Sequence, residues 1–430
     1  MVLDRKNNPQ IHEVNSAKII RASEIRLKNG IPVYHIKAGT QDLVKIELLF
    51  PAGMWQQPSP LVASASNAML QEGTSRHSSK EIAELLDYYG AFLETNITQD
   101  FASVAIYSLN KHLSNVLPTI EEIISDSVFN REEWDIYVGN KKQAFAVNCK
   151  KVDFVCRKKF SELIFGNDHP YGHNVFEPDF DVLKKEEAYN FYKQSYTATN
   201  TIIVASGNVT DDTLKLIEKS FGGLAAHSRL SSPRGEVPSL AERAGGEVFI
   251  EIPNSVQSSI RLGKLLFTKR HPDYLPMLVL NTVFGGYFGS RLMTNIREDK
   301  GYTYGIGSGM VSFKHAGYFT ISTEVGTDVT ANTIKEIYFE LGKIQTEKIS
   351  ESELQLVRSY MLGTFLRSMD GPFALADRFK GIYFNGLDYD YYDRYVETIR
   401  TISSEKLMEL ANTYWKKEEM IELVVGCLTP

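Results

Sequence analysis

The chain has 430 residues, of which 43% are hydrophobic, and its 47 basic and 53 acidic residues give a formal net charge of -6. A chain of this length exceeds the usual size of one domain, so two domains with sizeable cores are expected. The acidic balance excludes the overall positive field that nucleic acids and anionic membranes attract, and no window reaches the roughly eighteen uninterrupted apolar residues of a membrane-spanning helix.

Targeting signals and cysteine usage leave the compartment open. The first residues, Met1 to Val14, are polar and contain no apolar signal region, and 3 cysteines are too few for a disulfide framework in so long a chain. These features suit the cytoplasm slightly better, but they also fit an exported protein whose signal has been removed.

In the first half, strand patterns and turn residues alternate with helical segments. Lys28-Asn29-Gly30 is a typical hairpin turn, and Ser78 to Glu81 forms a capping box that opens a helix. The apolar run 201–206 is bounded by a glycine and predicts a buried strand. The remaining predicted elements are strands over 24–27, 32–36, 44–50, 92–98 and 101–109, and helices over 62–70 and 113–127.

A polar segment with proline and glycine breakers, residues 224–246, is typical of a linker. We therefore predict an α+β fold of two related domains, 15–223 and 247–430, each with a mixed sheet and helices packed on one face. The two halves are expected to form a clamshell. Beyond the linker the order of elements repeats, with strands over 248–252, 260–267, 302–311 and 318–325, and helices over 273–284, 290–299 and 330–345.

The stretch Ser290 to Tyr304, SRLMTNIREDKGYTY, resembles the substrate-side Arg/Tyr motif of the pitrilysin/insulinase (inverzincin) family of zinc peptidases. The chain is similar also to mitochondrial processing peptidase subunits. Arg297 and Tyr304 fall where that family carries its pair, and the resemblance implies that they hold substrate and stabilise a tetrahedral intermediate. A guanidinium and a phenolic hydroxyl suit this role, because negative charge develops on the carbonyl oxygen during peptide hydrolysis.

A glycine-rich approach precedes the pair, and family members carry a similar stretch. Here it contains Gly285, Gly286, Gly289 and Ser290. Its spacing matches neither phosphate-binding glycine motif, so we expect these glycines to let the backbone turn tightly and come close to a substrate. The competing interpretation of the pair is a surface arginine on a helix and an ordinary tyrosine on the following strand, or a vestige without a role.

The family's zinc-binding signature, His-x-x-Glu-His, is absent from its expected place. Its positions fall on Ser64, Asn67 and Ala68. The more distant glutamate ligand of the family falls near Gln143. Because these side chains are poor zinc donors, we expect no metal and no other cofactor on this chain. The resemblance implies that the zinc belongs to a partner subunit.

Two further features have alternative interpretations. His169 and His173 are four residues apart, but Pro170 and Gly172 between them favour a structural turn over a metal site. The basic stretch 141–159 is typical of a solvated helix face, and contact with an acidic partner or substrate is the alternative.

Together these features predict a catalytically incomplete subunit of a heteromeric zinc endopeptidase. Its partner would be a homologous chain with an intact His-x-x-Glu-His motif, unfolded peptides would bind as an added strand on a sheet edge, and homodimers are possible. The competing hypothesis is a structural or peptide-binding paralogue with no catalytic role. A self-sufficient hydrolase lacks support, because the chain has no G-x-S-x-G elbow and no cysteine in a recognisable histidine context.

Overall fold

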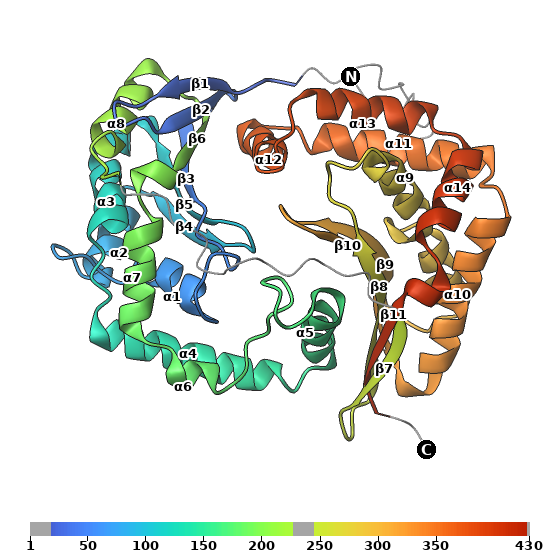
Figure 1. Ribbon diagram of the computed structural model, residues 1–430. Coiled ribbons are helices and arrows are strands. Elements are labelled where there is room, and N and C mark those ends of the chain that lie inside the picture. The colour runs from blue at the N-terminus through green and yellow to red at the C-terminus, as the bar shows by residue number, and fades with distance from the viewer. Residues whose placement is uncertain (1–18, 227–244, 428–430) are drawn as a thin grey trace, which may run out of the picture.

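The computed structural model describes residues 19–226 and 245–427 (Figure 1). It contains two mixed β-sheets, each packed with helices, which confirms the predicted α+β class. Most of the predicted linker, residues 227–244, lies outside the described residues, so the domain boundaries stay a prediction. None of the described helices is long and apolar enough to cross a membrane.

The first sheet has six strands in the order β1-β2-β6-β3-β5-β4. β2 and β6 are parallel, and the other neighbours are antiparallel. The strands are β1 (Ser23–Arg26), β2 (Pro32–Lys37), β3 (Leu43–Phe50), β4 (Phe92–Ile97), β5 (Ala102–Leu109) and β6 (Ile202–Gly207).

The second sheet has the order β7-β11-β8-β10-β9, again with one parallel pair, β7 and β11. Strand for strand, this order and these directions match β2-β6-β3-β5-β4 of the first sheet. The two halves are therefore a structural repeat, as the sequence predicts. The strands are β7 (Gly246–Glu251), β8 (Gln257–Leu266), β9 (Ile306–Ser312), β10 (Gly317–Gly326) and β11 (Ile421–Gly426).

Helices fill the connections between these strands. Those of the first half are α1 (Val62–Met69), α2 (Ser79–Tyr88), α3 (Leu113–Asp126), α4 (Arg131–Asn148), α5 (Val152–Phe165), α6 (Asp179–Val182), α7 (Lys185–Ser195) and α8 (Asp211–Phe221). Those of the second half are α9 (Tyr274–Gly285), a short π-helix η3 (Met293–Asp299), α10 (Thr330–Thr346), α11 (Glu351–Arg367), α12 (Pro372–Tyr383), α13 (Asp390–Thr401) and α14 (Ser404–Tyr414).

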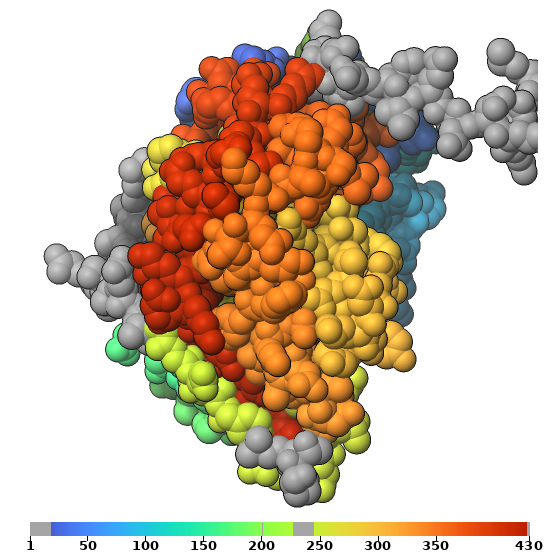
Figure 2. All heavy atoms as spheres, turned by 90° about the vertical axis from the view of Figure 1, so that its right-hand side faces the viewer, coloured from blue at the N-terminus to red at the C-terminus, as the bar shows by residue number. Residues whose placement is uncertain are grey.

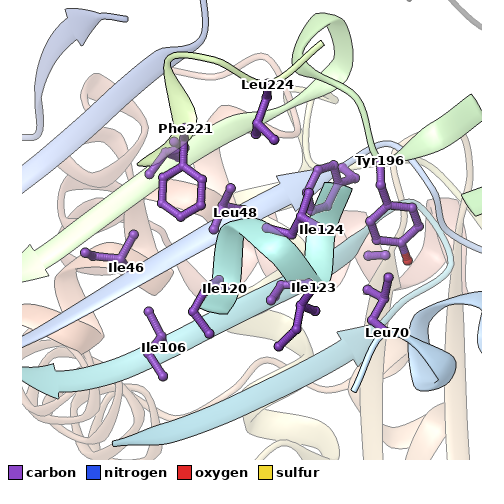
Figure 3. Close-up of a cluster of buried hydrophobic side chains, with 14 of the residues drawn as sticks. Ile46, Leu48, Leu70, Ile106, Ile120, Ile123, Ile124, Tyr196, Phe221 and Leu224 are labelled. Carbon is purple, nitrogen blue, oxygen red and sulfur yellow. The ribbon is translucent and has the colours of Figure 1, made fainter. Parts of the chain in front are cut away.

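Each sheet has its own hydrophobic core on one face. In the first half, Ile46 and Leu48 of β3 belong to one buried cluster with Ile120 of α3 (Figure 3). Each fully buried side chain of this size stabilises the fold by about 1.5–3 kcal/mol. In the second half, α9, α10, α11 and α14 surround Trp415. Figure 2 shows the outer side of this half, covered by orange and red helices.

The opposite face of each sheet is covered by a helix from the other half. On the first sheet, Leu375 and Phe379 of α12 pack with Leu49 of β3. On the second sheet, Cys156 and Phe160 of α5 pack with β11. Both helices lie between the sheets in Figure 1. The sequence did not predict this second layer, which leaves almost every residue of β3 buried on both faces.

Candidate functional site

The segment that carries Arg297 is a short π-helix rather than the ordinary helix that its sequence predicts. The wide turn shows in the backbone bond from Lys300 N to Asn295 O, five residues earlier, at 3.1 Å. Gly301, with φ +66°, ends the element as predicted. Short π-helical turns are rare and often occur at functional sites, so this geometry draws attention to the residues that it orients.

Arg297 lies at the surface with its charge only partly neutralised. Its side chain is 34% exposed, and Nη1 lies 3.8 Å from Oε1 of Glu298. The guanidinium also lies 4.6 Å from the ring centre of Phe288, which is itself 61% exposed. A cation held over an aromatic face is oriented while its outer N–H groups stay available. Phe288 belongs to the glycine-rich stretch, and sequence reasoning missed its role.

Tyr304 is 96% exposed, and it lies on a loop in which the preceding residue, Thr303, is held by hydrogen bonds. Thr303 Oγ1 lies 2.8 Å from the carbonyl oxygen of Glu324 on β10, and it accepts the Gly305 N–H at 3.1 Å. The hydroxyl of Thr323 donates to the Gly305 carbonyl at 3.0 Å. Because the loop is fastened to β10 beside it, the phenol projects into solvent.

The placement of Tyr304 corrects one expectation. The sequence suggested that Tyr304 lies on the strand after η3, but β9 begins only at Ile306. Within residues 19–226 and 245–427, no hydrogen bond or cation–π contact joins Arg297 to Tyr304, and the Tyr304 hydroxyl has no hydrogen-bond partner. Their convergence on one substrate atom stays a prediction.

The glycines of the glycine-rich stretch lie very close to neighbouring residues of the same chain. A Cβ on Gly285 would lie 2.5 Å from Oγ of Ser308 on β9, and one on Gly286 would lie 2.7 Å from Cα of Thr282. A Cβ on Gly289 would lie 2.9 Å from the Tyr287 ring. Gly285 therefore lets α9 pack against β9, whereas Gly286 and Gly289 permit close contacts within α9 and the loop that follows it. Their approach to a substrate stays a prediction.

Ser290 is the last residue of this stretch and precedes η3, which begins at Met293. Its side chain is 1% exposed, its carbonyl accepts the Thr294 N–H at 2.9 Å, and its Oγ has no hydrogen-bond partner. A buried hydroxyl of this kind carries a desolvation cost that is not repaid locally.

The positions that match the zinc signature lie on α1 and are occupied by internal contacts. Asn67 is 3% exposed and donates from Nδ2 to the hydroxyl of Tyr196 at 3.0 Å. Burial raises the pKa of Tyr196, so it stays a neutral phenol. Ser64 donates to the Leu61 carbonyl at 2.9 Å, and Ala68 offers no donor atom.

The position that matches the family's more distant glutamate ligand also lacks a zinc donor. Gln143 is exposed on α4. No group of three or more His, Cys, Asp or Glu side chains that could hold a metal ion occurs in the described part of the chain. Hydroxyl, methyl and amide groups do not match the imidazole, thiolate and carboxylate donors that zinc prefers.

The histidine pair forms the turn that the sequence predicts. His169 stacks on Phe165, and its Nδ1 accepts the Tyr171 N–H at 3.2 Å. Nδ1 of His173 instead lies 3.1 Å from the carbonyl oxygen of Asn167. The two rings thus have separate partners within the fold.

The basic stretch 141–159 is more than a solvated face. Lys142 pairs with Asp181 at 2.6 Å, and Lys159 pairs with Glu162 at 2.7 Å. Burial lowers the pKa of Lys158, which lies 4.6 Å from the ring centre of Phe145. The second part of the basic stretch belongs to α5, which packs on the second sheet.

Part of the chain matches a known protein family. A family model described as "Peptidase M16 inactive domain" matches residues 183–361, from just before α7 into α11. Over this segment the chain is similar to the M16 peptidases. The M16-matched segment includes both Arg297 and Tyr304 and excludes α1.

Individual proteins similar to this chain extend the relation over most of its length. An uncharacterized zinc protease of Rickettsia felis is 25% identical over 400 residues, covering 90% of this chain and 93% of that protein. A probable mitochondrial-processing peptidase subunit beta of Schizosaccharomyces pombe is 21% identical over 329 residues, covering 71% and 69%. The crystal structure of a peptidase M16 inactive domain from Pseudomonas fluorescens has the same fold, with a TM-score of 0.85 and 21% identity over 95% of this chain and 100% of that one.

Proposed function

We propose that this chain is the metal-free subunit of a two-chain zinc endopeptidase, and that it contributes Arg297 and Tyr304 to substrates held by a zinc-bearing partner. The observation that carries the proposal is Tyr304, a tyrosine 96% exposed on a loop fastened beside it by Thr303. Exposure of a large aromatic side chain on a fixed backbone has no use for folding, but it suits contact with another molecule.

The chemistry follows from the two side chains. A guanidinium and a phenol can both donate hydrogen bonds to the oxyanion that forms when a peptide carbonyl is attacked. In open water such donors are weak catalysts, because solvent competes for them. A partner that closes over this face would exclude water and strengthen both interactions. The partner would supply the metal, the attacking water and the base.

The adjacent sheet edge offers a place for the peptide. β9 is the last strand of its sheet and, among the strands of the described residues, pairs only with β10. The Ile306 N–H contacts Met293 Sδ and the Ser308 carbonyl accepts from Asn281 Nδ2. An extended peptide would therefore pair with the remaining outer N–H and C=O groups of β9, which is the geometry of strand addition. Tyr304 precedes this strand by two residues, so an added strand would run close to the phenol.

The relatives support a peptidase setting for this proposal. One is named a zinc protease and another a processing peptidase subunit. A non-catalytic, peptide-binding role is the second candidate. It is favoured by the contacts of Arg297 with Phe288 and Glu298, which occupy the guanidinium without engaging Tyr304.

The test uses the full chain mixed with a homologous chain that has an intact His-x-x-Glu-His motif. Neither chain alone should cleave an unfolded peptide, whereas the mixture should. Arg297→Ala and Tyr304→Phe should each lower kcat of the mixture by about a hundredfold, the usual effect of losing one oxyanion donor.

Matched controls separate this effect from general surface changes. Tyr88 is 82% exposed on α2, and the side chain of Arg131 is 72% exposed on α4. Tyr88→Phe and Arg131→Ala should leave the rate of the mixture unchanged. Wild-type rates in both Arg297→Ala and Tyr304→Phe would leave only the peptide-binding candidate.

A further inference from the structure

A cavity of about 350 Å³ lies between the two halves of the molecule. The first half contributes the turn between β4 and β5, residues 98–101. The second half contributes Lys269, which precedes α9, the turn from Ser312 to Lys314, and one side of α12. Cavities of this size between domains are common places for small ligands.

The carboxylates that line this cavity are already engaged. Asp100 accepts the backbone N–H of Lys314 at 2.9 Å and the hydroxyl of Tyr171. Asp377 pairs with Lys380 at 2.9 Å, and Lys380 also pairs with Glu47 at 2.7 Å. Asp377 is therefore compensated, whereas Asp100 has neutral partners and keeps its charge. Among the described residues, neither carboxylate lies within 4.0 Å of another lysine in the lining.

Two other lysines line the cavity: Lys314 is exposed to solvent, whereas Lys269 is partly buried. In the described part of the chain no carboxylate lies within 4.0 Å of its Nζ, although its backbone N–H is fixed by Oγ of Ser312 at 3.0 Å. Burial and the nearby guanidinium of Arg378 both lower the pKa of Lys269. An ammonium withdrawn from water without a counter-charge is destabilising, and an anion beside it would remove that cost.

The other wall of the cavity is apolar. The rings of Phe101 and Phe384, one from each half, stack with centroids 4.5 Å apart, and both line the cavity together with Phe313. Gln99 also lines it and has a buried Oε1 without a hydrogen-bond partner.

We propose that this cavity binds a small organic anion, with its carboxylate or phosphate group beside Lys269 and its apolar part against Phe101 and Phe384. Such a ligand touches both halves of the chain. It therefore links them more rigidly when bound, independently of any peptide at Arg297 and Tyr304.

Calorimetric titration of the full chain with three phenyl compounds tests the charge and its source. Benzoate and phenyl phosphate carry the two anionic groups, and benzamide is a neutral compound of benzoate's shape. We expect saturable one-to-one binding of at least one anion, and binding of benzamide weaker by about tenfold or more, which corresponds to one lost ion pair. Benzoate alone identifies a carboxylate site, and phenyl phosphate alone a phosphate site.

Variants assign the binding to this cavity. Lys269→Met should lower the affinity for the anion by about tenfold or more. Lys215→Met, at a lysine whose side chain is 76% exposed on α8, should not change it. Absence of saturable binding by either anion, equal binding of benzamide, or unchanged affinity in Lys269→Met would overturn the proposal.

A second measurement on the wild-type chain keeps the test decisive if Lys269→Met fails to fold. Limited acetylation followed by mass spectrometry reports the accessibility of each lysine amine. A saturating concentration of the bound anion should protect Lys269 several-fold and leave Lys215 unprotected. Equal acetylation of Lys269 with and without the anion would refute the site.

Discussion

The ion cluster that fastens α12 to the first sheet gives the sharpest prediction about stability. The Glu47 side chain on β3 is 6% exposed, and its Oε2 lies 2.7 Å from Nζ of Lys380 and 3.1 Å from Nζ of Lys45. Lys380 has a second carboxylate, Asp377, at 2.9 Å. Glu47 therefore compensates two lysines, and Lys45, whose side chain is 8% exposed, depends on it alone among the described residues.

Glu47→Gln keeps the size of the side chain and removes the central charge. Lys380 retains Asp377, but Lys45 becomes a buried cation without a counter-charge. Breaking a buried pair in this way costs about 3–5 kcal/mol in the free energy of unfolding. Lys380→Met leaves Lys45 and Glu47 as a balanced pair, so we expect a smaller loss of about 1–2 kcal/mol.

Urea unfolding followed by far-UV circular dichroism measures both losses. Lys348→Met is the control, because Lys348 and Glu405 form a pair whose side chains are 60% and 61% exposed, and such pairs contribute about 0–1 kcal/mol. If Lys380→Met costs as much as Glu47→Gln, or if neither exceeds the control, the argument from charge compensation is refuted.

Two further predictions concern pH and metal. Burial alone would lower the pKa of Lys45, but the charge of Glu47 outweighs burial and raises this pKa above 10.5. The stabilisation from the Lys45–Glu47 pair is therefore complete below the ordinary lysine pKa, and it is lost as the pH rises through the raised value. The stability difference between wild type and Glu47→Gln should shrink above about pH 10.5 in unfolding titrations, and a constant difference would count against the cause given. Elemental analysis should find far less than one zinc per chain after dialysis, because α1 offers no suitable donors, and stoichiometric zinc would contradict this.

Local features of the fold could be predicted from the sequence because a few adjacent residues decide them. Gly30 has φ +87° in the predicted hairpin turn, and Gly301 ends η3 in the same left-handed region. Ser78 and Glu81 form the predicted capping box at the start of α2. In each case the conformation depends on a glycine without a Cβ or on a side chain that reaches its own backbone.

The packing of α12 on the first sheet and of α5 on the second sheet could not be predicted in this way. The apolar face of α12, with Leu375 and Phe379, would suit either sheet, and only the tertiary fold selects the one that contains Leu49. The position of Tyr304 was missed for a similar reason. The sequence around Tyr304 is typical of a strand. In the structure Thr303 hydrogen-bonds through its side chain to Glu324 on β10, and β9 begins only at Ile306. Non-local hydrogen bonds overrode the local pattern in that loop.

Asn67 and Tyr304 differ in whether their polar groups have partners within the fold, and this difference directs the functional proposal to Tyr304. Asn67, where the zinc signature would place its glutamate, is buried and satisfied by the hydroxyl of Tyr196 at 3.0 Å. That contact serves the fold and needs no ligand, because neither group is left without a partner. Tyr304 is the opposite case, since its loop is fixed while its hydroxyl has no partner among the described residues. Folding explains the first arrangement completely, whereas the second leaves the Tyr304 hydroxyl open to solvent and to any molecule that binds this face, as the proposal requires.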